Sequence, residues 1–326
     1  MPVETPELEL QSYLRLNHAS SREWLSAVRL LLGCASIECH VAGNQARVGA
    51  LSAIDVEGGR IACLYASQDM DISGCQAEGP VLVVPVEGHV EASWDDHSWW
   101  PVSPLLIMHA GNRPRLRLGE KSQVIILKPA PGVVPAPVGD EPNRLISEIR
   151  HLVDNYLFKA GFFFNDQHAR ALTTELFRSL GALLGNGGRR HIPECLKLDR
   201  RLLRVLDRFR QHPEWEFDLR GLAAHCGVSE RNLYYLMKRE TGMTPYRLFQ
   251  RYRLIRVRWR LVDCTCDIPH ISTYAADEGF SHLGRFAALY REHFGELPSE
   301  TVQWRRNLCA DAKSPQDRAA VSEVTK

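Results

Sequence analysis

The spacing of apolar positions changes partway along the 326-residue chain. Up to about residue 128 they form short runs, rich in β-branched residues and separated by Gly, Pro and Asp, as in residues 47–54, 80–88 and 122–128. Short runs of this kind predict an antiparallel sandwich or barrel. From residue 142 onward apolar residues recur every three or four positions, which predicts helices. The pattern therefore indicates an α+β protein with a β-rich amino-terminal part and a helical carboxy-terminal part.

Two helical patterns, residues 144–158 and 167–184, follow a Pro-rich joint at 129–142. They predict a helical hairpin, which either pairs two subunits or covers the open face of the β-rich part. Residues 185–194 contain several glycines and predict a flexible linker to the next part of the chain.

One sequence pattern occurs twice in the carboxy-terminal part. Ala223 lies four residues before Gly227, and Ala275 lies four residues before Gly279. A small residue lets the first helix of a helix-turn-helix lie close to the second, and Gly adopts the turn conformation. We therefore predict two helix-turn-helix units, with a turn one residue longer in the second. Ser229 and Ser281 are expected to cap their second helices.

Residues 244–263 join the two units. Thr244 is a predicted N-cap, Pro245 suits the first helical position, and no breaker follows, so one long helix is expected. At about 1.5 Å per residue it would span roughly 30 Å, near the ~34 Å between successive major-groove faces of DNA. Its arginines are expected to face phosphate or solvent; they are Arg251, Arg253, Arg256, Arg258 and Arg260.

The segment from about residue 199 to 306 resembles the DNA-binding domain of AraC/XylS-family bacterial transcription regulators. The residues that carry the resemblance are Ala275, Gly279, Phe280, Phe286, Tyr290, Phe294, Gly295 and Pro298. The strings HLGRFA and FGELPSET resemble the XylS-like branch, although the first also occurs in regulators similar to the ethanolamine regulator. In two positions, Gly284 and Ala288, this chain departs from the base-contacting side chains that the family often carries, which predicts weak sequence reading by the second unit.

The resemblance implies a domain order. Residues 1–190 would form a cupin-like effector-binding and dimerisation domain with a helical hairpin at 142–186. Residues 196–306 would form the all-α DNA-binding domain with two helix-turn-helix motifs joined by a long helix. Residues 307–326 would be a polar tail without ordered structure.

Charge agrees with this division. The segment from Leu196 to Arg306 carries 20 Lys and Arg against 14 Asp and Glu, and the remainder carries 20 against 25. A basic module next to an acidic one suits attraction to phosphates at one end of the chain.

Early residues of the second helix face base edges in a helix-turn-helix. The candidates in the first unit are Ser229, Glu230, Arg231, Tyr234, Tyr235 and Lys238. Those in the second are Ser281, His282, Leu283, Gly284, Arg285, Ala288 and Arg291. We predict that Arg231 reads a guanine, whereas Arg285 contacts either a base or a phosphate.

The candidate effector-binding residues are Trp94, His109 and Arg115. Trp94 could stack on an aromatic ring and Arg115 could pair with a carboxylate, although ordinary packing or a solvated strand face would also explain them. The resemblance favours an aromatic carboxylate as effector and leaves an amino alcohol or a quaternary amine open.

No catalytic, cofactor or metal site is predicted. A metal-binding cupin usually presents a His-x-His pair, but here the spacing is His89, Val90, Glu91, with His97 and His109 beyond. Known nucleophile, phosphate and dinucleotide motifs are absent from the sequence. The nine cysteines, Cys264 and Cys266 among them, are expected to be reduced thiols rather than a redox or metal pair.

We therefore expect a cytoplasmic, homodimeric activator of a catabolic operon that binds double-stranded DNA, a small-molecule effector and RNA polymerase, with no membrane segment. Two alternatives stay open. The amino-terminal domain could only dimerise or bind a protein partner, or the chain could be a cupin enzyme with an appended DNA-binding module.

Overall fold

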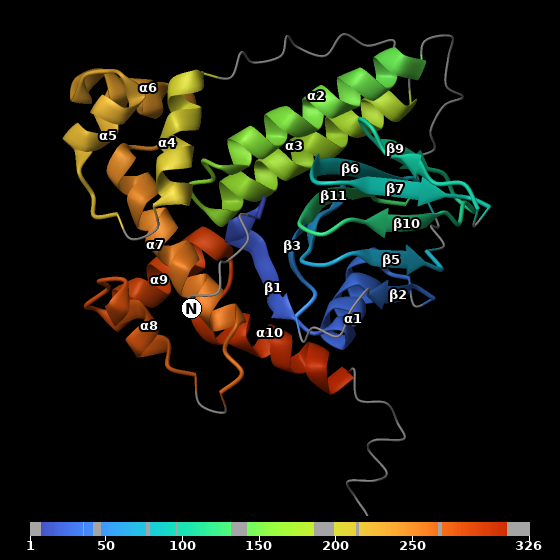
Figure 1. Ribbon diagram of the computed structural model, residues 1–326. Helices are drawn as coiled ribbons and strands as arrows, with labels where there is room; N and C mark the ends of the chain where they lie inside the picture. The colour runs from blue at the N-terminus through green and yellow to red at the C-terminus, as the bar shows by residue number, and fades with distance from the viewer. Residues whose placement is uncertain are drawn as a thin grey trace, which may run out of the picture.

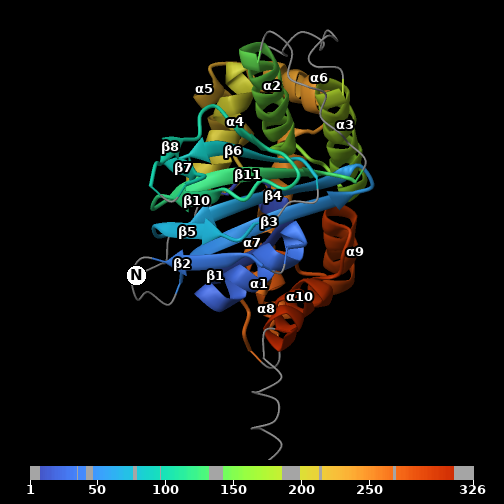
Figure 2. The same cartoon turned by 90° about the vertical axis from the view of Figure 1, so that its right-hand side faces the viewer.

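The computed structural model describes residues 8–34, 36–41, 47–75, 79–95, 97–131, 142–185, 199–212, 215–266 and 269–311. Two antiparallel sheets form the amino-terminal domain (Figures 1 and 2). The six-stranded sheet has the order β1 (Leu14–Ala19), β3 (Gly49–Val56), β4 (Gly59–Ala66), β11 (Ser122–Pro129), β6 (Val81–Glu87), β9 (Leu106–Met108). The five-stranded sheet has the order β2 (Glu38–Val41), β5 (Met70–Ser73), β10 (Arg115–Leu118), β7 (Val90–Ser93), β8 (Trp100–Pro101).

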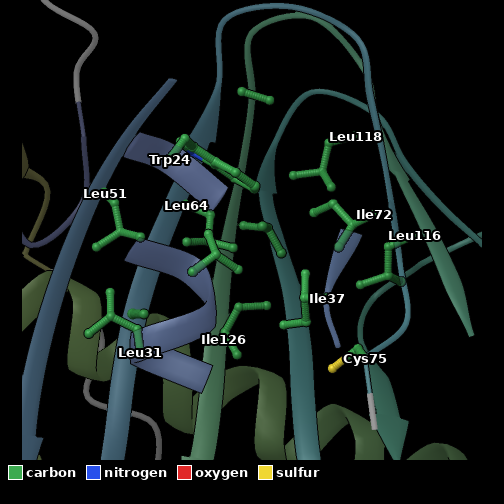
Figure 3. Close-up of a cluster of buried hydrophobic side chains, with 14 of the residues drawn as sticks. Trp24, Leu31, Ile37, Leu51, Leu64, Ile72, Cys75, Leu116, Leu118 and Ile126 are labelled. Carbon is green, nitrogen blue, oxygen red and sulfur yellow. The ribbon is translucent and has the colours of Figure 1, made fainter. Parts of the chain in front are cut away.

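Apolar side chains from both sheets and from α1 (Ser21–Leu32) fill the space between the sheets. Ser20 and Glu23 cap α1 reciprocally, and Trp24 of α1 is fully buried. Figure 3 shows Trp24 and Leu31 of α1 in one cluster with Leu64 and Ile126 of one sheet and Leu116 of the other. The predicted β-rich amino-terminal part is confirmed, but the strand pairs of the described residues form two sheets rather than a closed barrel.

A helical hairpin covers the outer face of the six-stranded sheet. It consists of α2 (Pro142–Ala160) and α3 (Asp166–Gly185), and Ile149, Val153 and Leu180 pack in one core with Ile54 and Ile125 of the sheet. Because this sheet is buried on both faces, its strands read as continuous apolar runs. Of the two roles expected for the hairpin, covering the sheet is the one observed, and pairing of subunits stays a prediction.

The carboxy-terminal region is all helical. Its elements are α4 (Arg200–Gln211), α5 (Leu219–Cys226), α6 (Glu230–Thr241), α7 (Pro245–Val262), α8 (Ile271–Asp277), α9 (Leu283–Phe294) and α10 (Pro298–Asp311). The long helix α7 begins as predicted, because the Thr244 hydroxyl accepts a hydrogen bond from the Arg247 N–H and Pro245 occupies the first turn. It contributes Leu248 and Tyr252 to one core and Leu254 and Leu261 to the next. One helix therefore belongs to two cores and connects them rigidly.

The two domains are in direct contact. Strand β1 lies against α7 and α10, and Leu308 of α10 is buried in the core between the two sheets. The tail expected from residue 307 therefore starts inside a helix, which continues to Asp311.

Some expected segments lie outside the described residues: most of the Pro-rich joint (132–141), the glycine-containing linker (186–198) and residues 312–326. Within the described part of the chain, no helix combines the length and apolar character that crossing a membrane requires.

Candidate nucleic-acid interface

The first helix-turn-helix consists of α5 and α6. Ala223 is buried where the helices meet, and Gly227 ends α5 in the left-handed conformation, with φ 72°. The Ser229 hydroxyl accepts a hydrogen bond from the Asn232 N–H at 3.3 Å, so the predicted N-cap of α6 is confirmed. Gly242 ends α6, again in the left-handed conformation.

The second helix-turn-helix consists of α8 and α9. Ala275 is buried and Gly279 takes the left-handed turn, with φ 74°. Two residues lie between Gly279 and the N-cap His282, whereas one lies between Gly227 and the N-cap Ser229, so the longer turn is confirmed. The prediction that Ser281 caps α9 is wrong, because the extra residue places Ser281 one position before the N-cap. The His282 side chain makes no cap hydrogen bond.

Helix α6 brings the first set of predicted DNA-binding residues onto one exposed surface; these are Ser229, Glu230, Arg231, Tyr234, Tyr235 and Lys238. The Arg231 guanidinium lies 5.6 Å from the centre of the Tyr235 ring, so the two side chains stack. The Lys238 ammonium donates to the Gly242 carbonyl at 3.2 Å. This surface is polar and offers long donors to DNA.

The second set is also exposed, at the start and along the outer face of α9; it comprises Ser281, His282, Leu283, Gly284, Arg285, Ala288 and Arg291. Leu283 is 49% exposed. The guanidinium groups of Arg285 and Arg291 make no hydrogen bond or ion pair with any residue that the structure describes. They are therefore available for a negatively charged partner.

Most of the arginines of α7 are buried or paired inside the protein rather than facing phosphate or solvent as expected, and Arg260 is the most exposed of those that form ion pairs. Arg251 is 5% exposed and donates to the Ala160 carbonyl at 3.0 Å and to the Ser12 hydroxyl at 2.7 Å. Burial lowers the pKa of Arg251 to about 10. Arg260 pairs with Asp277 of α8, and Arg256 pairs with Glu278, the residue after that helix. The expectation failed because the amino-terminal domain and α8 pack around α7 and turn most of its circumference into interior.

Arg258 is the most deeply buried of these arginines, with no exposed surface. It pairs with Glu296 at 2.8 Å, donates to the Tyr290 hydroxyl at 3.3 Å, and donates to the Leu14 carbonyl of β1 at 3.2 Å. Burial by itself would lower the pKa of Arg258, but Tyr290 and Glu296 outweigh it and raise the pKa. A buried charge therefore ties α7, the second helix-turn-helix and the amino-terminal domain together.

Glu296 connects the same two domains from the other side. It accepts from Arg15 of β1 at 2.6 Å as well as from Arg258. Burial alone would raise the pKa of Glu296, but Arg258 and Arg15 lower it to about 2. The carboxylate is thus ionised at neutral pH and holds one arginine from each domain.

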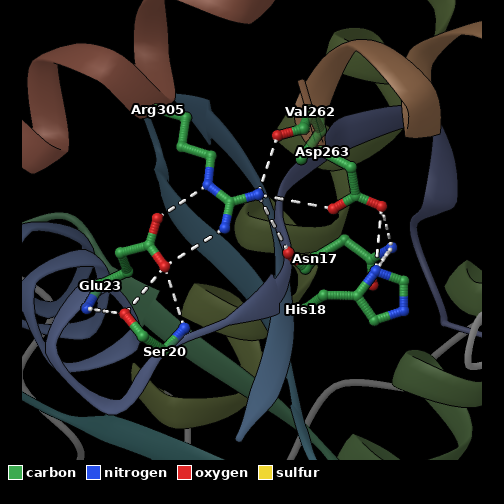
Figure 4. Close-up of polar contacts among 7 residues, drawn as sticks. All are labelled: Asn17, His18, Ser20, Glu23, Val262, Asp263 and Arg305. Carbon is green, nitrogen blue, oxygen red and sulfur yellow. Dashed lines mark hydrogen bonds and ion pairs between the residues drawn. The ribbon is translucent and has the colours of Figure 1, made fainter. Parts of the chain in front are cut away.

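A second polar cluster joins α1 and β1 to the end of α7 and to α10 (Figure 4). Arg305 donates to Glu23 at 2.8 Å and to the Val262 carbonyl at 3.1 Å. Asp263 accepts from the Asn17 amide and contacts a ring nitrogen of His18, both at 3.0 Å. Burial alone would raise the pKa of Glu23, but hydrogen bonds from Arg305 and Ser20 lower it to about 2.

The candidate effector residues are dispersed. Trp94 is 55% exposed and His109 is also exposed. Arg115 points away from the core, contacts Asp71 at 3.4 Å and lies 5.5 Å from the Trp99 ring. A cavity of about 540 Å³ lies elsewhere, beside α7 and α8, lined by Arg256, Trp259, Arg260, Asp263, Cys264, Thr265, Cys266, Tyr274 and Glu278.

In the part of the chain that the structure describes, the candidate metal ligands and the candidate thiol pair do not form a site. His89 contacts Glu91 at 3.2 Å, and across the described ranges no three His, Cys, Asp or Glu side chains come together as a metal site would require. Cys264 is buried and Cys266 is exposed, both as free thiols.

Comparisons with known proteins fit this geometry. Residues 222–303 match the family model described as a helix-turn-helix domain. The chain is 31% identical over 148 residues to "XylDLEGF operon transcriptional activator 2" of Pseudomonas putida, covering 45% of this chain and 90% of that protein. It is 36% identical over 103 residues to "XylDLEGF operon transcriptional activator 1" of the same species, covering 32% of this chain but only 31% of that protein. Among solved structures, a probable AraC family transcriptional regulator from Rhodopseudomonas palustris is 30% identical, with 32% of this chain and 96% of that chain covered and a TM-score of 0.30.

Proposed function

Because the chain belongs to the AraC/XylS family of DNA-binding transcription regulators, we propose that it is an effector-responsive activator of a catabolic operon. The observation that carries the proposal is the single helix α7, which contributes to the cores of both helix-turn-helix units. Figure 1 shows α5 and α6 near one end of α7, and α8 and α9 near the other.

Helix α7 gives the two units a fixed separation. Its 18 residues span about 27 Å, of the same order as the ~34 Å between successive major-groove faces. We propose that α6 and α9 enter adjacent major grooves on one side of a duplex. In this arrangement Arg231 donates to a guanine, and Arg285 and Arg291 hold phosphates.

The contacts of β1 suggest how an effector would act. Arg15 binds Glu296, which follows α9. The Leu14 carbonyl accepts from Arg258 of α7, which in turn donates to Tyr290 of α9 in the second helix-turn-helix. A ligand that moves β1 would therefore move or release that unit rather than the first. Relatives of this chain include two that are named as activators of the XylDLEGF operon. With these relatives in view, we propose an aromatic carboxylate as the effector.

The remaining parts of the proposal concern assembly. We propose a homodimer that recruits RNA polymerase, with the amino-terminal domain, divided from the DNA-binding domain near residues 190–196, as the effector-binding and dimerisation unit. The candidate effector residues remain Trp94, His109 and Arg115. We assign no catalytic function, because the relatives that match are named as transcription regulators.

Chromatin immunoprecipitation with sequencing tests this function. Cells grown on an aromatic carboxylate should give discrete peaks upstream of a catabolic operon, and cells grown on a neutral carbon source should give fewer or weaker peaks. The Arg231→Ala variant at equal abundance should give weaker peaks at these sites. Absence of discrete peaks for the unaltered protein, together with no sequence preference of the purified protein, would contradict the proposal. Equal peaks under both conditions would contradict only its effector part.

A further inference from the structure

Helices α6 and α9 can be aligned residue by residue. Each has 12 residues, each follows directly after its N-cap, Ser229 or His282, and each ends at a left-handed glycine. In this register Arg231 corresponds to Gly284, and Tyr235 corresponds to Ala288. The positions that carry long side chains on the exposed surface of the first unit thus carry glycine and alanine in the second.

Gly284 and Ala288 form a continuous small-residue strip on the outer face of α9. At about 100° per residue they lie opposite the buried Phe286 and Tyr290. A Cβ placed on Gly284 would meet no atom within 4 Å, so the strip is open to solvent. Arg285 and Arg291 border it, one on each side.

The strip is also clear of the amino-terminal domain. Asp166 of α3 lies against Gly295, at the opposite end of α9. The residues at the start of α9, from Ser281 to Arg285, are all exposed. DNA could therefore reach Gly284 and Ala288 without moving the two domains apart.

Neither Gly284 nor Ala288 can donate a side-chain hydrogen bond to a base. The one apolar group that a base edge presents in the major groove is the C5-methyl group of thymine. Building on the proposed function, we propose that α9 recognises thymine through this methyl group. Ala288 supplies the methyl contact, Gly284 lets the helix approach the base edges closely, and Arg285 and Arg291 hold the flanking phosphates.

The two helix-turn-helix units then use different chemistry. The first discriminates by hydrogen bonds, and the second discriminates by apolar contact and close approach. The site recognised by α9 should be rich in A·T pairs, with thymine required at one position on a defined strand.

Deoxyuridine provides a direct test, because it differs from thymidine only by the missing methyl group. Duplexes are first selected from a random library with the full-length protein, and the half-site that changes with Arg231→Ala is assigned to α6. Each thymine in the other half-site is then replaced by deoxyuridine. At one position the affinity should fall about fourfold, the effect of one buried methyl group.

The Ala288→Gly variant completes a double-mutant cycle. Compared with the unaltered protein, it should bind the thymine duplex about fourfold more weakly and should bind the deoxyuridine duplex with the same affinity. If glycine weakens binding by destabilising α9, the loss of affinity is the same on both duplexes and cancels when the two changes in binding free energy are subtracted. Deoxyuridine in the half-site of α6 is the matched control, and its effect should be the same for both proteins.

Three outcomes would overturn the inference. The affinity of the unaltered protein could be insensitive to every deoxyuridine in the second half-site, or the sensitivity could persist undiminished in Ala288→Gly. A protein that selects no DNA sequence at all would overturn the proposed function as well, so the two failures are distinguishable.

Discussion

The two helix-turn-helix units share a backbone plan and differ in what surrounds it. The core of the first runs from α4 to the start of α7 and includes Phe162, which follows α2 of the helical hairpin; its outer surface carries Arg231, Tyr235 and Lys238. The second shares the buried Arg258 and Glu296 with β1, and its outer surface carries Gly284 and Ala288. A polar surface thus belongs to the unit that packs against the helical hairpin, and a small-residue surface belongs to the unit that β1 contacts.

This difference suggests a division of labour. The first unit can recognise its half-site independently of β1, whereas the position of the second depends on buried ion pairs across the domain boundary. Regulation through β1 would therefore act mainly on the second unit, and the following changes should separate the two.

The largest effect is expected from Arg258→Ala. Removing this guanidinium leaves Glu296 without its buried partner, and breaking a buried pair costs about 3–5 kcal/mol. Urea unfolding should show the loss, and hydrogen exchange should locate it in α9 and α10. Arg285→Ala, an exposed change in the same unit, is the control and should stay within about 0.5 kcal/mol of the unaltered protein. Equal destabilisation of α5 and α6 would contradict the asymmetry.

Acid should weaken the second unit first. The pKa of Glu296 is lowered from 4.5 to about 2. A lowered carboxyl pKa means that its stabilisation is complete above about pH 4.5 and is lost as the pH falls towards 2, an effect on the order of 3 kcal/mol. Unfolding free energies measured from pH 7 to pH 2 test this, with Glu296→Gln as the variant. The variant should be less stable at pH 7 and should show a shallower decline below pH 4.5; an unchanged slope would contradict the assignment.

Arg231→Ala should change specificity rather than stability. Loss of a bidentate contact to guanine costs about 1–3 kcal/mol of discrimination at one base pair. Binding measured on duplexes with each base at that position should show the preference disappear. Arg239→Ala, at another exposed position of α6, is the matched control. Full retention of the guanine preference would show that Arg231 does not read that base.

The smallest effect is expected from Arg15→Ala. The Arg15 and Glu296 side chains are 21% and 17% exposed, so their ion pair contributes at most about 1 kcal/mol. Hydrogen exchange should nevertheless rise in α9 while α6 stays unchanged. Faster exchange in both units would mean that β1 constrains them equally.

The sequence predicted the helix-turn-helix units well because their signals are local. Gly227, Gly279 and the cap of α7 at Thr244 each act within one or two turns of their own position. The same holds for the longer turn of the second unit. Ser281 was misjudged as a cap because the turn length decides which residue precedes the helix, and one residue of difference was enough to displace it.

Nonlocal features could not be predicted in this way. Arg251 and Arg258 looked like surface charges, and only the contacts with Ser12 and Leu14, more than 200 positions earlier in the chain, show that they are interior. The apolar runs of β3 and β11 indicated strands, yet whether they close a barrel depends on pairing partners that spacing does not specify. In the same way, the spacing of apolar residues showed the apolar face of the hairpin of α2 and α3 but did not show which sheet that face covers.

The most direct test of the account is selection of DNA from a random library by the full-length protein and by Arg231→Ala. We predict a motif of two elements about one helical turn apart, roughly 10 base pairs, because α7 fixes the separation of α6 and α9. Arg231→Ala should lose a guanine from one element and leave the other intact. A motif with a single element, or one in which both elements change together, would contradict the claim that two distinct readers share one rigid helix.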